Sequence, residues 1–343
     1  MDSKFFDGIK IKHFDEVSIN TNLRCNLNCV MCHQGEIKHK KDMSFELFKK
    51  ILINLKKSGV KKIALIGGEI FVIKDMWKFI GLMEHMGFKY DLSSNLFYIP
   101  HVERLKELKG LERINTSLDG LSKTHNSIRR SSKAFENTVK NIKTLIEMGI
   151  PINSACVVQK ANFSELESLT EFLCKLGVKS LSFLVPNKIT SEEKEYAIKE
   201  VNQVSGGNSE FFVTTIKNPL GELGEEEIKL FKTKVENINK ICKKYEAKAG
   251  FADQLLNPKL MFKNTSLKDY TCSLFNGYDS YVYDDGVLST CPFTKLEGEK
   301  FKLSSNPALN ILNSPEYLRI RKSFKILGAP EKCRYCCALV KKN

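Results

Sequence analysis

The sequence predicts an α/β fold, a partial (β/α)6 barrel followed by a small C-terminal domain. From Val17 to about Val185, short β-like runs alternate with amphipathic helical stretches, which is typical of βα units around a parallel sheet. Several of these helical stretches end on glycine shortly before the next strand. Five of the eleven cysteines follow residue 251, in a segment that we expect to depend on a metal centre for its fold.

Six strands and five helical stretches carry the barrel prediction. The strands are expected at Val17–Asn20, Lys62–Ile66, Phe88–Ser93, Arg113–Leu118, Ile152–Val158 and Ser180–Val185. The clearest helix follows the capping residue Ser44 and ends at Gly59, with apolar residues at helical spacing between them. The others are DMWKFIGLMEHMG, HVERLKELKG, FENTVKNIKTLIEMG and FSELESLTEFLCKLG. Six βα units are fewer than the eight of a closed barrel, so the barrel should be partial.

The chain is expected to divide into three units. Residues 1–185 form the predicted barrel, and residues 186–250 form a bridge that contains a long helix from Glu225 to Lys248. Residues 251–343 hold turn signals such as DDG and NG and should contain little regular helix. A chain of 343 residues is long enough for one large core and a smaller unit of this kind.

Composition indicates the compartment and argues against two kinds of partner. The N-terminus is charged throughout, and no stretch approaches the ~20 apolar residues that span a bilayer. We therefore expect a cytoplasmic protein with no membrane partner, whose closely spaced cysteines ligate metal rather than form disulfides. The net charge of +14 comes from lysines spread along the chain, which favours a basic surface over nucleic-acid binding.

The run CNLNCVMC places Cys25, Cys29 and Cys32 in one loop just after the first expected strand. Functional groups of parallel α/β folds gather on loops at the carboxyl ends of strands. Four-iron clusters normally take four cysteine ligands, so a three-cysteine loop leaves one iron open to a ligand or substrate. A structural zinc loop completed by His33 is the alternative, although zinc sites favour cysteine pairs at x2 spacing with a more distant ligand.

CNLNCVMC resembles the CxxxCxxC signature of the radical S-adenosylmethionine (SAM) superfamily, and further motifs extend the resemblance over most of the chain. IGGEI, with Gly67, Gly68 and Glu69, is similar to the family's GGE motif, which binds the amino group of SAM. Glycine lets the backbone approach a ligand closely, and a carboxylate is a charge-assisted partner for an ammonium group. Ile70 follows the motif where the family usually has proline.

Two later stretches resemble parts of the family that lie close to SAM. SSNL, at the end of the third expected strand, matches a place where the family often has a polar residue near the SAM ribose or carboxylate. The resemblance therefore implies contacts from Ser94 and Asn95. NTSLDG is similar to the ISLDG strand of the sulfatase-maturase-like branch, which implies a hydroxyl from Ser117 and a carboxylate from Asp119.

The stretch THNSIRR resembles the HDxxR stretch of the family. This resemblance implies that Arg129 pairs with the SAM carboxylate, with Arg130 as the alternative. Asn126 stands where the family has aspartate after the histidine. His125 is given no catalytic role, because an isolated histidine is more often structural or solvated.

Cysteines near the C-terminus supply a second, closed ligand set: Cys272, Cys291, Cys333 and Cys336. Four thiolates can hold zinc or a four-iron cluster. The spacing resembles the SPASM or twitch domain that follows radical SAM cores, whose single auxiliary cluster is held by two cysteines flanking a hairpin and a later CxxC. The implied fold is a partial (β/α)6 barrel with a small C-terminal iron–sulfur (twitch) domain. Cys337 is either a spare thiol or a competing ligand.

The resemblance implies a radical SAM enzyme with SAM and two 4Fe–4S clusters, reduced by an electron donor such as flavodoxin or ferredoxin. SAM would be cleaved to methionine and a 5′-deoxyadenosyl radical that abstracts a substrate hydrogen. Our first hypothesis is oxidation or epimerisation of a small molecule, because only about fifteen residues precede the first expected strand, too few for a leader-peptide-binding domain. The second is a maturase of a ribosomal peptide or protein side chain. The third is a zinc-bearing RNA-binding protein.

Several further residues are given no role. Cys156 lies on an apolar strand, whereas Cys174 and Cys242 lie within amphipathic helices, so each is expected to behave as a small buried hydrophobe. The sequence identifies no catalytic acid, base or hydrogen donor. The polar residues considered for such roles without assignment are His33, His39, Asp253, Tyr278, Asp279, Tyr281 and Tyr283.

Overall fold

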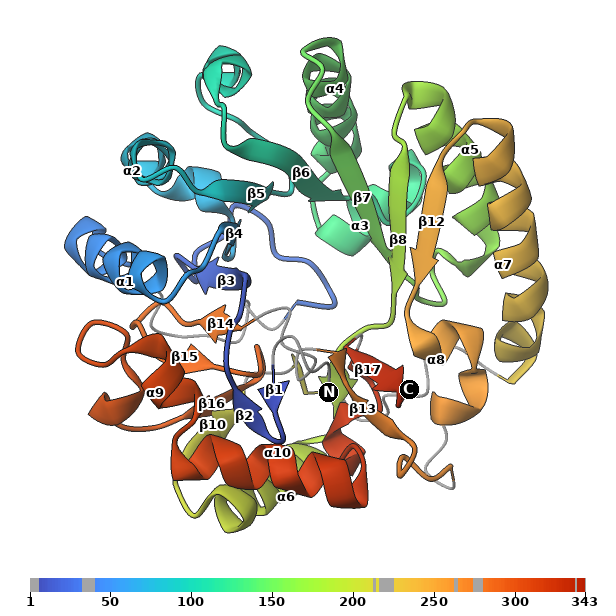
Figure 1. Cartoon of the computed structure of the whole chain (residues 1–343). Helices are drawn as coiled ribbons and strands as arrows, with labels where there is room; N and C mark the ends of the chain where they lie inside the picture. Colours follow the sequence, from blue (N-terminus) through green and yellow to red (C-terminus); the bar gives the residue numbers. More distant parts are fainter. Residues whose placement is uncertain are drawn as a thin grey trace.

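A nine-stranded sheet curves into an open barrel with helices along its outer face (Figure 1). The computed structural model describes residues 6–32, 41–211, 214–215, 225–261, 265–273, 280–336 and 338–342. The strand order is β12-β8-β7-β6-β5-β4-β3-β14-β15, and every neighbouring pair is parallel except β14 and β15. The predicted fold class, an α/β partial barrel, is confirmed.

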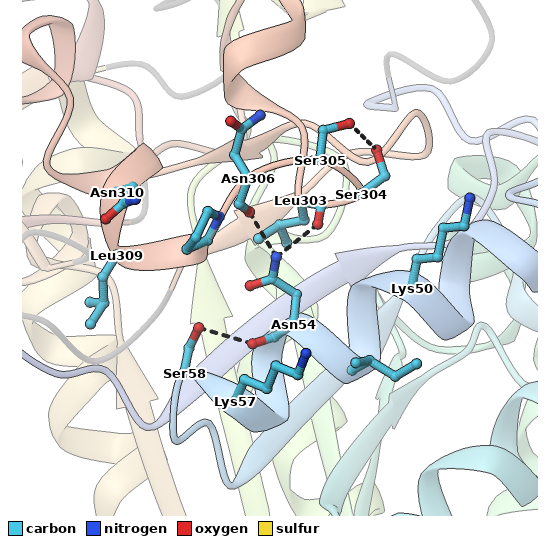
Figure 2. A pocket seen from close by; sticks show the side chains of 12 residues that line it. Lys50, Asn54, Lys57, Ser58, Leu303, Ser304, Ser305, Asn306, Leu309 and Asn310 are labelled. Atoms are coloured by element: carbon cyan, nitrogen blue, oxygen red, sulfur yellow. Dashed lines mark hydrogen bonds between the residues drawn. The ribbon is translucent and has the colours of Figure 1, made fainter.

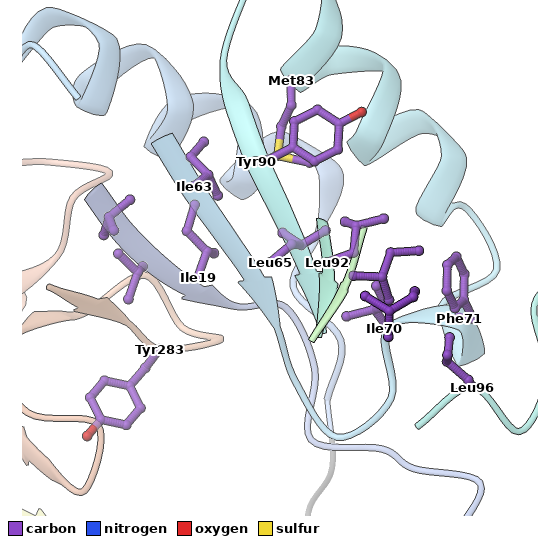
Figure 3. Packing of buried hydrophobic residues seen from close by; sticks show 14 of the residues in the cluster. Ile19, Ile63, Leu65, Ile70, Phe71, Met83, Tyr90, Leu92, Leu96 and Tyr283 are labelled. Atoms are coloured by element: carbon purple, nitrogen blue, oxygen red, sulfur yellow. The ribbon is translucent and has the colours of Figure 1, made fainter. Parts of the chain in front are cut away.

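All six predicted strands are present, with ends within one or two residues of the expected ones. They are β3 (Glu16–Asn20), β4 (Lys62–Ile66), β5 (Lys89–Ser93), β6 (Leu111–Ser117), β7 (Ile152–Val157) and β8 (Ser180–Leu184). Ile19, Ile63, Leu65 and Leu92 lie close together in a cluster that continues across neighbouring strands (Figure 3). Because side chains alternate along a strand, the positions between these residues face the concave side of the sheet.

Helices cover the outer face of the barrel. They are α1 (Phe45–Lys57), α2 (Met76–His85), α4 (Ala134–Glu147), α5 (Leu166–Leu176) and α7 (Glu225–Lys244), while α3 (Ser122–Arg129) follows β6 and packs on α4. The predicted cap of the first helix is confirmed, because the Ser44 hydroxyl accepts the backbone N–H of Leu47 at 3.2 Å. HVERLKELKG forms only the 3₁₀ helix η3 (Val102–Glu107), since left-handed His101 and the extended Leu108 leave six residues between them.

The segment after β8 extends both edges of the sheet. The long helix expected from Glu225 to Lys248 ends at Lys244, because Glu246 is left-handed and the chain then forms β12 (Lys248–Phe251). On the other edge, β14 (Tyr281–Val282) pairs with β3 and with β15 (Leu288–Ser289). The expected boundaries at residues 185 and 250 stay a prediction.

The expectation of little regular helix after residue 251 is wrong. The structure has α8 (Asp253–Leu256), α9 (Ala308–Leu312) and the 13-residue α10 (Pro315–Leu327). The sequence analysis missed the signal of Pro315 at the first helical position, where a missing N–H costs nothing. A further helix, α6 (Ser191–Ser205), begins with a capping box between Thr190 and Glu193. No helix in the described part of the chain is both long and apolar enough to cross a bilayer.

Small paired strands and single 3₁₀ turns complete the described structure. The strand pairs are β1 (Phe6–Asp7) with β2 (Lys10–Ile11), β9 (Lys188–Ile189) with β11 (Thr214–Thr215), β10 (Ser209–Phe211) with β16 (Thr294–Leu296), and β13 (Tyr270–Cys272) with β17 (Leu339–Lys341). The turns are η2 (Ile70–Val72), η4 (Phe163–Glu165), η5 (Pro258–Met261), η7 (Glu299–Phe301) and η8 (Glu331–Cys333).

Asn54 of α1 joins the barrel to the segment before α9 (Figure 2). Its side-chain nitrogen donates to the carbonyl oxygens of Leu303 at 2.9 Å and Asn306 at 2.7 Å, and its oxygen accepts the N–H of Ala308 at 3.2 Å. Asn54 also lines a surface pocket between these segments. The polar atoms of Asn54 are therefore engaged in this junction.

Candidate functional site

The loop after β3 carries the three cysteines of the CNLNCVMC run. At its start, the N–H of Thr21 donates to the carbonyl of Ile66, the last residue of β4, at 2.9 Å. The Cys29 thiol is buried, whereas Cys25 and Cys32 are half-buried. The carboxyl ends of parallel strands share one edge of the sheet, so this loop lies beside the polar segments that follow β4, β5 and β6.

The turn after β4 packs directly on the cysteine loop. The N–H of Gly68 donates to the carbonyl of Asn22 at 2.9 Å, and the N–H of Glu69 donates to that of Arg24 at 2.8 Å. A Cβ on Gly67 would lie 2.1 Å from the side-chain oxygen of Asn22, and one on Gly68 would lie 2.1 Å from the carbonyl oxygen of Arg24. Non-bonded atoms pack at about 3.5–4.0 Å, so neither gap admits a side chain. These glycines therefore let the backbone of the turn after β4 approach the cysteine loop closely.

Glu69 is a buried carboxyl group beside this loop, with a side chain only 1% exposed. One of its oxygens accepts the N–H of Phe71 at 3.1 Å and the hydroxyl of Ser94 at 2.8 Å, and the other accepts the N–H of Asn95 at 2.7 Å. Burial raises the pKa of Glu69 from 4.5 to about 7, against the lowering effect of these three hydrogen bonds. No Lys or Arg in the described residues forms an ion pair with it, so the group is suited to a cationic ligand.

Ser94 and Asn95 are brought to the site by the segment after β5. Ser94 is engaged with Glu69 and also accepts the N–H of Leu96 at 3.0 Å. The side-chain nitrogen of Asn95 donates to the side-chain oxygen of Asn26 at 2.7 Å and lies 3.7 Å from the Cys25 sulfur. Both residues therefore support the carboxyl group and the cysteine loop in the structure as it stands.

Asp119 and Arg129 form a buried ion pair next to Cys29 of the cysteine loop. One Asp119 oxygen accepts Nε of Arg129 at 2.7 Å and lies 2.5 Å from Nη2. The remaining terminal nitrogen, Nη1, lies 3.5 Å from the Cys29 sulfur. Burial disfavours the charged guanidinium, but Asp119 and Cys29 outweigh this effect and raise the pKa of Arg129. Arg130, the alternative, is exposed.

His125 has a structural role in this arrangement, as expected. Its Nδ1 accepts the backbone N–H of Asp119 at 3.0 Å. Burial, with the neighbouring charge of Arg129, lowers the pKa of His125 to about 3, so the ring is neutral. Ser117, the last residue of β6, is half-buried.

The first cysteine set has the chemistry that an iron–sulfur cluster needs. N–H donors approach two of the sulfurs: Leu27 lies 3.4 Å from Cys25, and Arg129 lies 3.5 Å from Cys29. Burial raises the pKa of Cys25 to about 11, partly offset by the Leu27 N–H, and a bound iron would replace that proton. Among described residues, no three His, Cys, Asp or Glu side chains gather around one point as a single metal ion requires. A cluster differs, because each thiolate binds a separate iron.

The second cysteine set meets in one small cavity. Cys272, Cys291, Cys333 and Cys336 all line it, together with apolar side chains that include Leu296, Ile320 and Phe324. The N–H of Ala338 lies 3.4 Å from the Cys336 sulfur. Burial raises the pKa of Cys333 well above its ordinary value, while Lys332 opposes this effect. Four thiols in one apolar cavity fit a four-iron cluster with no open position. Cys337 lies outside the described residues.

Gln254 and Arg334 hold the CxxC turn of this cavity. The Gln254 side-chain nitrogen donates to the carbonyls of Arg334 at 3.0 Å and Cys336 at 2.7 Å. Arg334 is buried and bonds the carbonyl of Leu260 at 2.6 Å. The sequence analysis missed both residues, as it missed Asn22, because an isolated Gln, Arg or Asn outside a motif carries no signal.

The residues set aside in the sequence analysis behave differently from one another. Cys156, Cys174 and Cys242 are buried, as expected. Asp253 accepts the N–H of Lys341 at 3.1 Å. The hydroxyl of Tyr281 accepts the side-chain N–H of Asn20 at 3.0 Å, and that of Tyr283 donates to the Cys291 carbonyl at 3.0 Å. His33, His39, Tyr278 and Asp279 lie outside the described residues.

Residues 19–173 match the radical SAM superfamily, which confirms the resemblance that the sequence motifs predicted. A GTP 3′,8-cyclase of Campylobacter fetus is 28% identical over 221 residues, which cover 58% of this chain and 68% of the relative. An Fe-coproporphyrin III synthase of Methanosarcina barkeri is 27% identical over 158 residues, which cover 45% of this chain and 39% of the relative.

The fold is shared with SuiB of Streptococcus suis, in a solved structure bound to SAM. The TM-score is 0.67 at 16% identity, and the match covers 95% of this chain and 73% of SuiB. This likeness shows the fold, whereas the resemblance to the radical SAM superfamily rests on the sequence match. That match gives the RNA-binding hypothesis no support.

Gly68→Ala should destabilise the protein and prevent assembly of the first cysteine loop, because the added Cβ meets the Arg24 carbonyl at 2.1 Å. Gly81→Ala in α2 is the matched control: its Cβ has open space, and alanine should stabilise the helix by up to about 1 kcal/mol. Urea unfolding of both variants measures the difference. Equal stability of the two would contradict the packing argument.

Glu69→Gln should change how stability depends on pH in the SAM-free protein. The pKa of Glu69 is raised to about 7, so its contribution to stability falls as pH rises from 4.5 towards 7, where the unfolded chain loses its proton first. Between about pH 5 and about pH 8 the variant should gain roughly 2.5 kcal/mol relative to wild type. Urea unfolding at several pH values measures this gain.

Glu84→Gln is the matched control for that series. Burial opposes ionisation of Glu84, but hydrogen bonds from Tyr90, Gly110 and Lys109 outweigh it and lower the pKa. The stability contribution of Glu84 is therefore present above 4.5 and lost only at lower pH, so its variant should show a flat difference over the same range. A flat difference for Glu69→Gln as well would mean that Glu69 is ionised throughout.

Proposed function

We propose that the chain binds a four-iron cluster through Cys25, Cys29 and Cys32 and uses it to cleave SAM reductively. When bound, the cluster supplies the electron that splits SAM into methionine and a 5′-deoxyadenosyl radical, which takes a hydrogen atom from the substrate. The observation that carries the proposal is the buried Glu69 carboxyl group, held beside the cysteine loop without a described cationic partner. The ammonium group of SAM would supply the positive charge that pairs with this carboxyl group.

Some of the remaining site residues are proposed to contact SAM, and the others hold those residues in place. Arg129 is proposed to pair with the SAM carboxylate, and Ser117 to offer a hydroxyl at the end of β6. Ser94 and Asn95 hold the Glu69 carboxylate by the hydrogen bonds already described. Asp119 acts through Arg129, because its carboxylate is engaged with that guanidinium.

We infer a second four-iron cluster in the cavity of Cys272, Cys291, Cys333 and Cys336, which defines a twitch-type unit over residues 251–343. Residues 1–185 then form the core and residues 186–250 the bridge. The support is that four thiols distant in sequence line one apolar cavity. A closed cluster of this kind supplies an acceptor for one electron, which favours substrate oxidation over epimerisation.

The concave face of the sheet supports a neutral, polar substrate. Asn115, Asn153, Ser180 and Ser182 form a hydrogen-bonded amide–hydroxyl strip across β6, β7 and β8, with distances of 2.8–3.3 Å. Lys62 and Arg113 lie on the same face, and both pair with Asp91, at 3.1 and 2.8 Å. A strip of this kind suits hydroxyl or amide groups better than the triphosphate of GTP.

A small polar molecule is therefore our first substrate class, and its oxidation the first reaction. The second candidate is the maturation of a ribosomal peptide or a protein side chain, because the amides of the strip can also pair with a peptide backbone. SuiB, with the same fold, has been solved bound to its precursor peptide SuiA. Reduction by flavodoxin or ferredoxin in the cytoplasm fits the redox chemistry and the abundance of cysteine.

Anaerobically reconstituted protein should carry about eight irons per chain, four in each cluster. Replacing Cys25, Cys29 and Cys32 together by Ala should halve the iron and abolish 5′-deoxyadenosine formation from SAM. Cys174→Ala is the control, since this buried thiol belongs to neither set. Iron analysis and chromatography of the SAM products give the readout, and zinc in place of iron would refute the proposal.

Cys272→Ala should also halve the iron but leave 5′-deoxyadenosine formation in place, because the first cysteine set is intact. Cys242→Ala, another buried thiol outside both sets, should retain all the iron. Circular dichroism must show that both variants are folded. Full iron content in folded Cys272→Ala would remove this cysteine from the ligand set and leave the SAM chemistry unaffected.

A further inference from the structure

We propose that Arg129 is also a positioning residue for the first cluster: its guanidinium, fixed by Asp119, holds a positive charge and an N–H donor against the sulfur of Cys29. The inference rests on the proposed function, because it requires that Cys29 ligates iron. It gives Arg129 a role at the cluster ligand, beyond the role proposed for it at the SAM carboxylate.

The guanidinium geometry leaves little freedom. Nε and Nη2 of Arg129 both bind one carboxylate oxygen of Asp119, at 2.7 and 2.5 Å. Since the guanidinium is planar, fixing two nitrogens also fixes the third. That third nitrogen, Nη1, lies 3.5 Å from the Cys29 sulfur, and both the arginine and the cysteine are buried.

Asp119 is itself held by hydrogen bonds on several sides. Its second oxygen accepts the N–H of Val157 at 2.9 Å. Its carbonyl accepts the side-chain N–H of Asn162 at 2.7 Å, and its own N–H donates to His125 at 3.0 Å. The carboxylate therefore cannot turn away without breaking a buried hydrogen bond, which makes it a rigid support for the guanidinium.

The helix that carries Arg129 is docked on the cysteine loop by the backbone as well. The N–H of Val30, next to Cys29, donates to the carbonyl of Ile128 at 3.0 Å. The contact between Arg129 and Cys29 is therefore part of a two-point junction between α3 and the loop. Arg130, the next residue, is left-handed and exposed, and takes no part in the junction.

A fixed cation beside a cluster ligand has a defined physical effect. The reduced cluster carries one more negative charge than the oxidised cluster, so a nearby positive charge stabilises the reduced form. Hydrogen bonds to cluster sulfurs and the local net charge both set the reduction potential. Arg129 should therefore raise the midpoint potential of the first cluster and make it easier to reduce.

The test is a redox titration of reconstituted full-length protein, monitored by electron paramagnetic resonance without SAM. The first cluster is identified by the signal that is missing when Cys25, Cys29 and Cys32 are all replaced by Ala. Arg129→Gln should shift its midpoint potential to a more negative value, and Arg129→Lys should shift it less, because lysine keeps the charge but lacks the planar fork. Arg130→Asn is the matched control and should keep the wild-type potential.

Arg129→Gln leaves Asp119 as a buried carboxylate without its cation, which endangers folding. The double variant Asp119→Asn with Arg129→Gln removes both charges and keeps polar groups at both positions. Loss of the Asp119 charge by itself would raise the midpoint potential. A shift to a more negative potential in the double variant must therefore come from the loss of the Arg129 cation. If the folded, iron-loaded double variant has a potential no more negative than that of Asp119→Asn alone, the inference is overturned.

Two further outcomes separate the inference from the proposed function. If wild-type protein takes up no iron, the proposed function itself fails. If iron-loaded Arg129→Gln keeps the wild-type potential and loses only SAM affinity, Arg129 serves the SAM carboxylate alone and the present inference is wrong. Equilibrium binding of radiolabelled SAM to the same preparations measures that affinity.

Discussion

The contact between the cysteine loop and the turn after β4 is the constraint on which the rest of the site depends. Two backbone hydrogen bonds join these segments, and neither Gly67 nor Gly68 has room for a side chain against Asn22 and Arg24. Because the segments touch backbone to backbone, the carboxyl group of Glu69 is buried beside the thiols. A larger residue at either glycine would move the Glu69 carboxyl group away from the cysteine loop.

An acidic group and a basic group, on Glu69 and Arg129, approach the cysteine loop from different elements. Glu69 reaches the site from β4 without a described cationic partner, whereas Arg129 reaches it from α3 and is held by Asp119. The amino-acid end of SAM carries an ammonium and a carboxylate, so the proposed function gives each a partner of opposite charge. Of these two charged residues, Arg129 also contacts a cysteine sulfur, at 3.5 Å, and in the proposed function this contact would link SAM binding to the electronic state of the cluster.

The C-terminal segment both extends the sheet and supplies the four cysteines of the second cavity. β14 adds beside β3, which places Tyr281 next to Asn20 on the concave face. Two residues later, the Tyr283 hydroxyl bonds the carbonyl of Cys291, and the two tyrosine rings pack edge to face with centroids 4.7 Å apart. The short segment from Tyr281 to Tyr283 thus connects the interior of the barrel to the second thiol set. A change in the structure of one of these sites should therefore alter the other.

The sequence by itself determined the βα rhythm and the six core strands, because hydrophobic periodicity is a local property, and its cysteine spacings predicted the two ligand sets. It missed α10 and the roles of Asn22 and Gln254, which lie outside any motif. Only the tertiary structure decided why Gly67 and Gly68 are required, which arginine is buried, and that Asp119 serves Arg129. Those facts depend on contacts between segments distant in the chain, and local patterns do not encode which backbone atom or charge the fold brings within bonding distance.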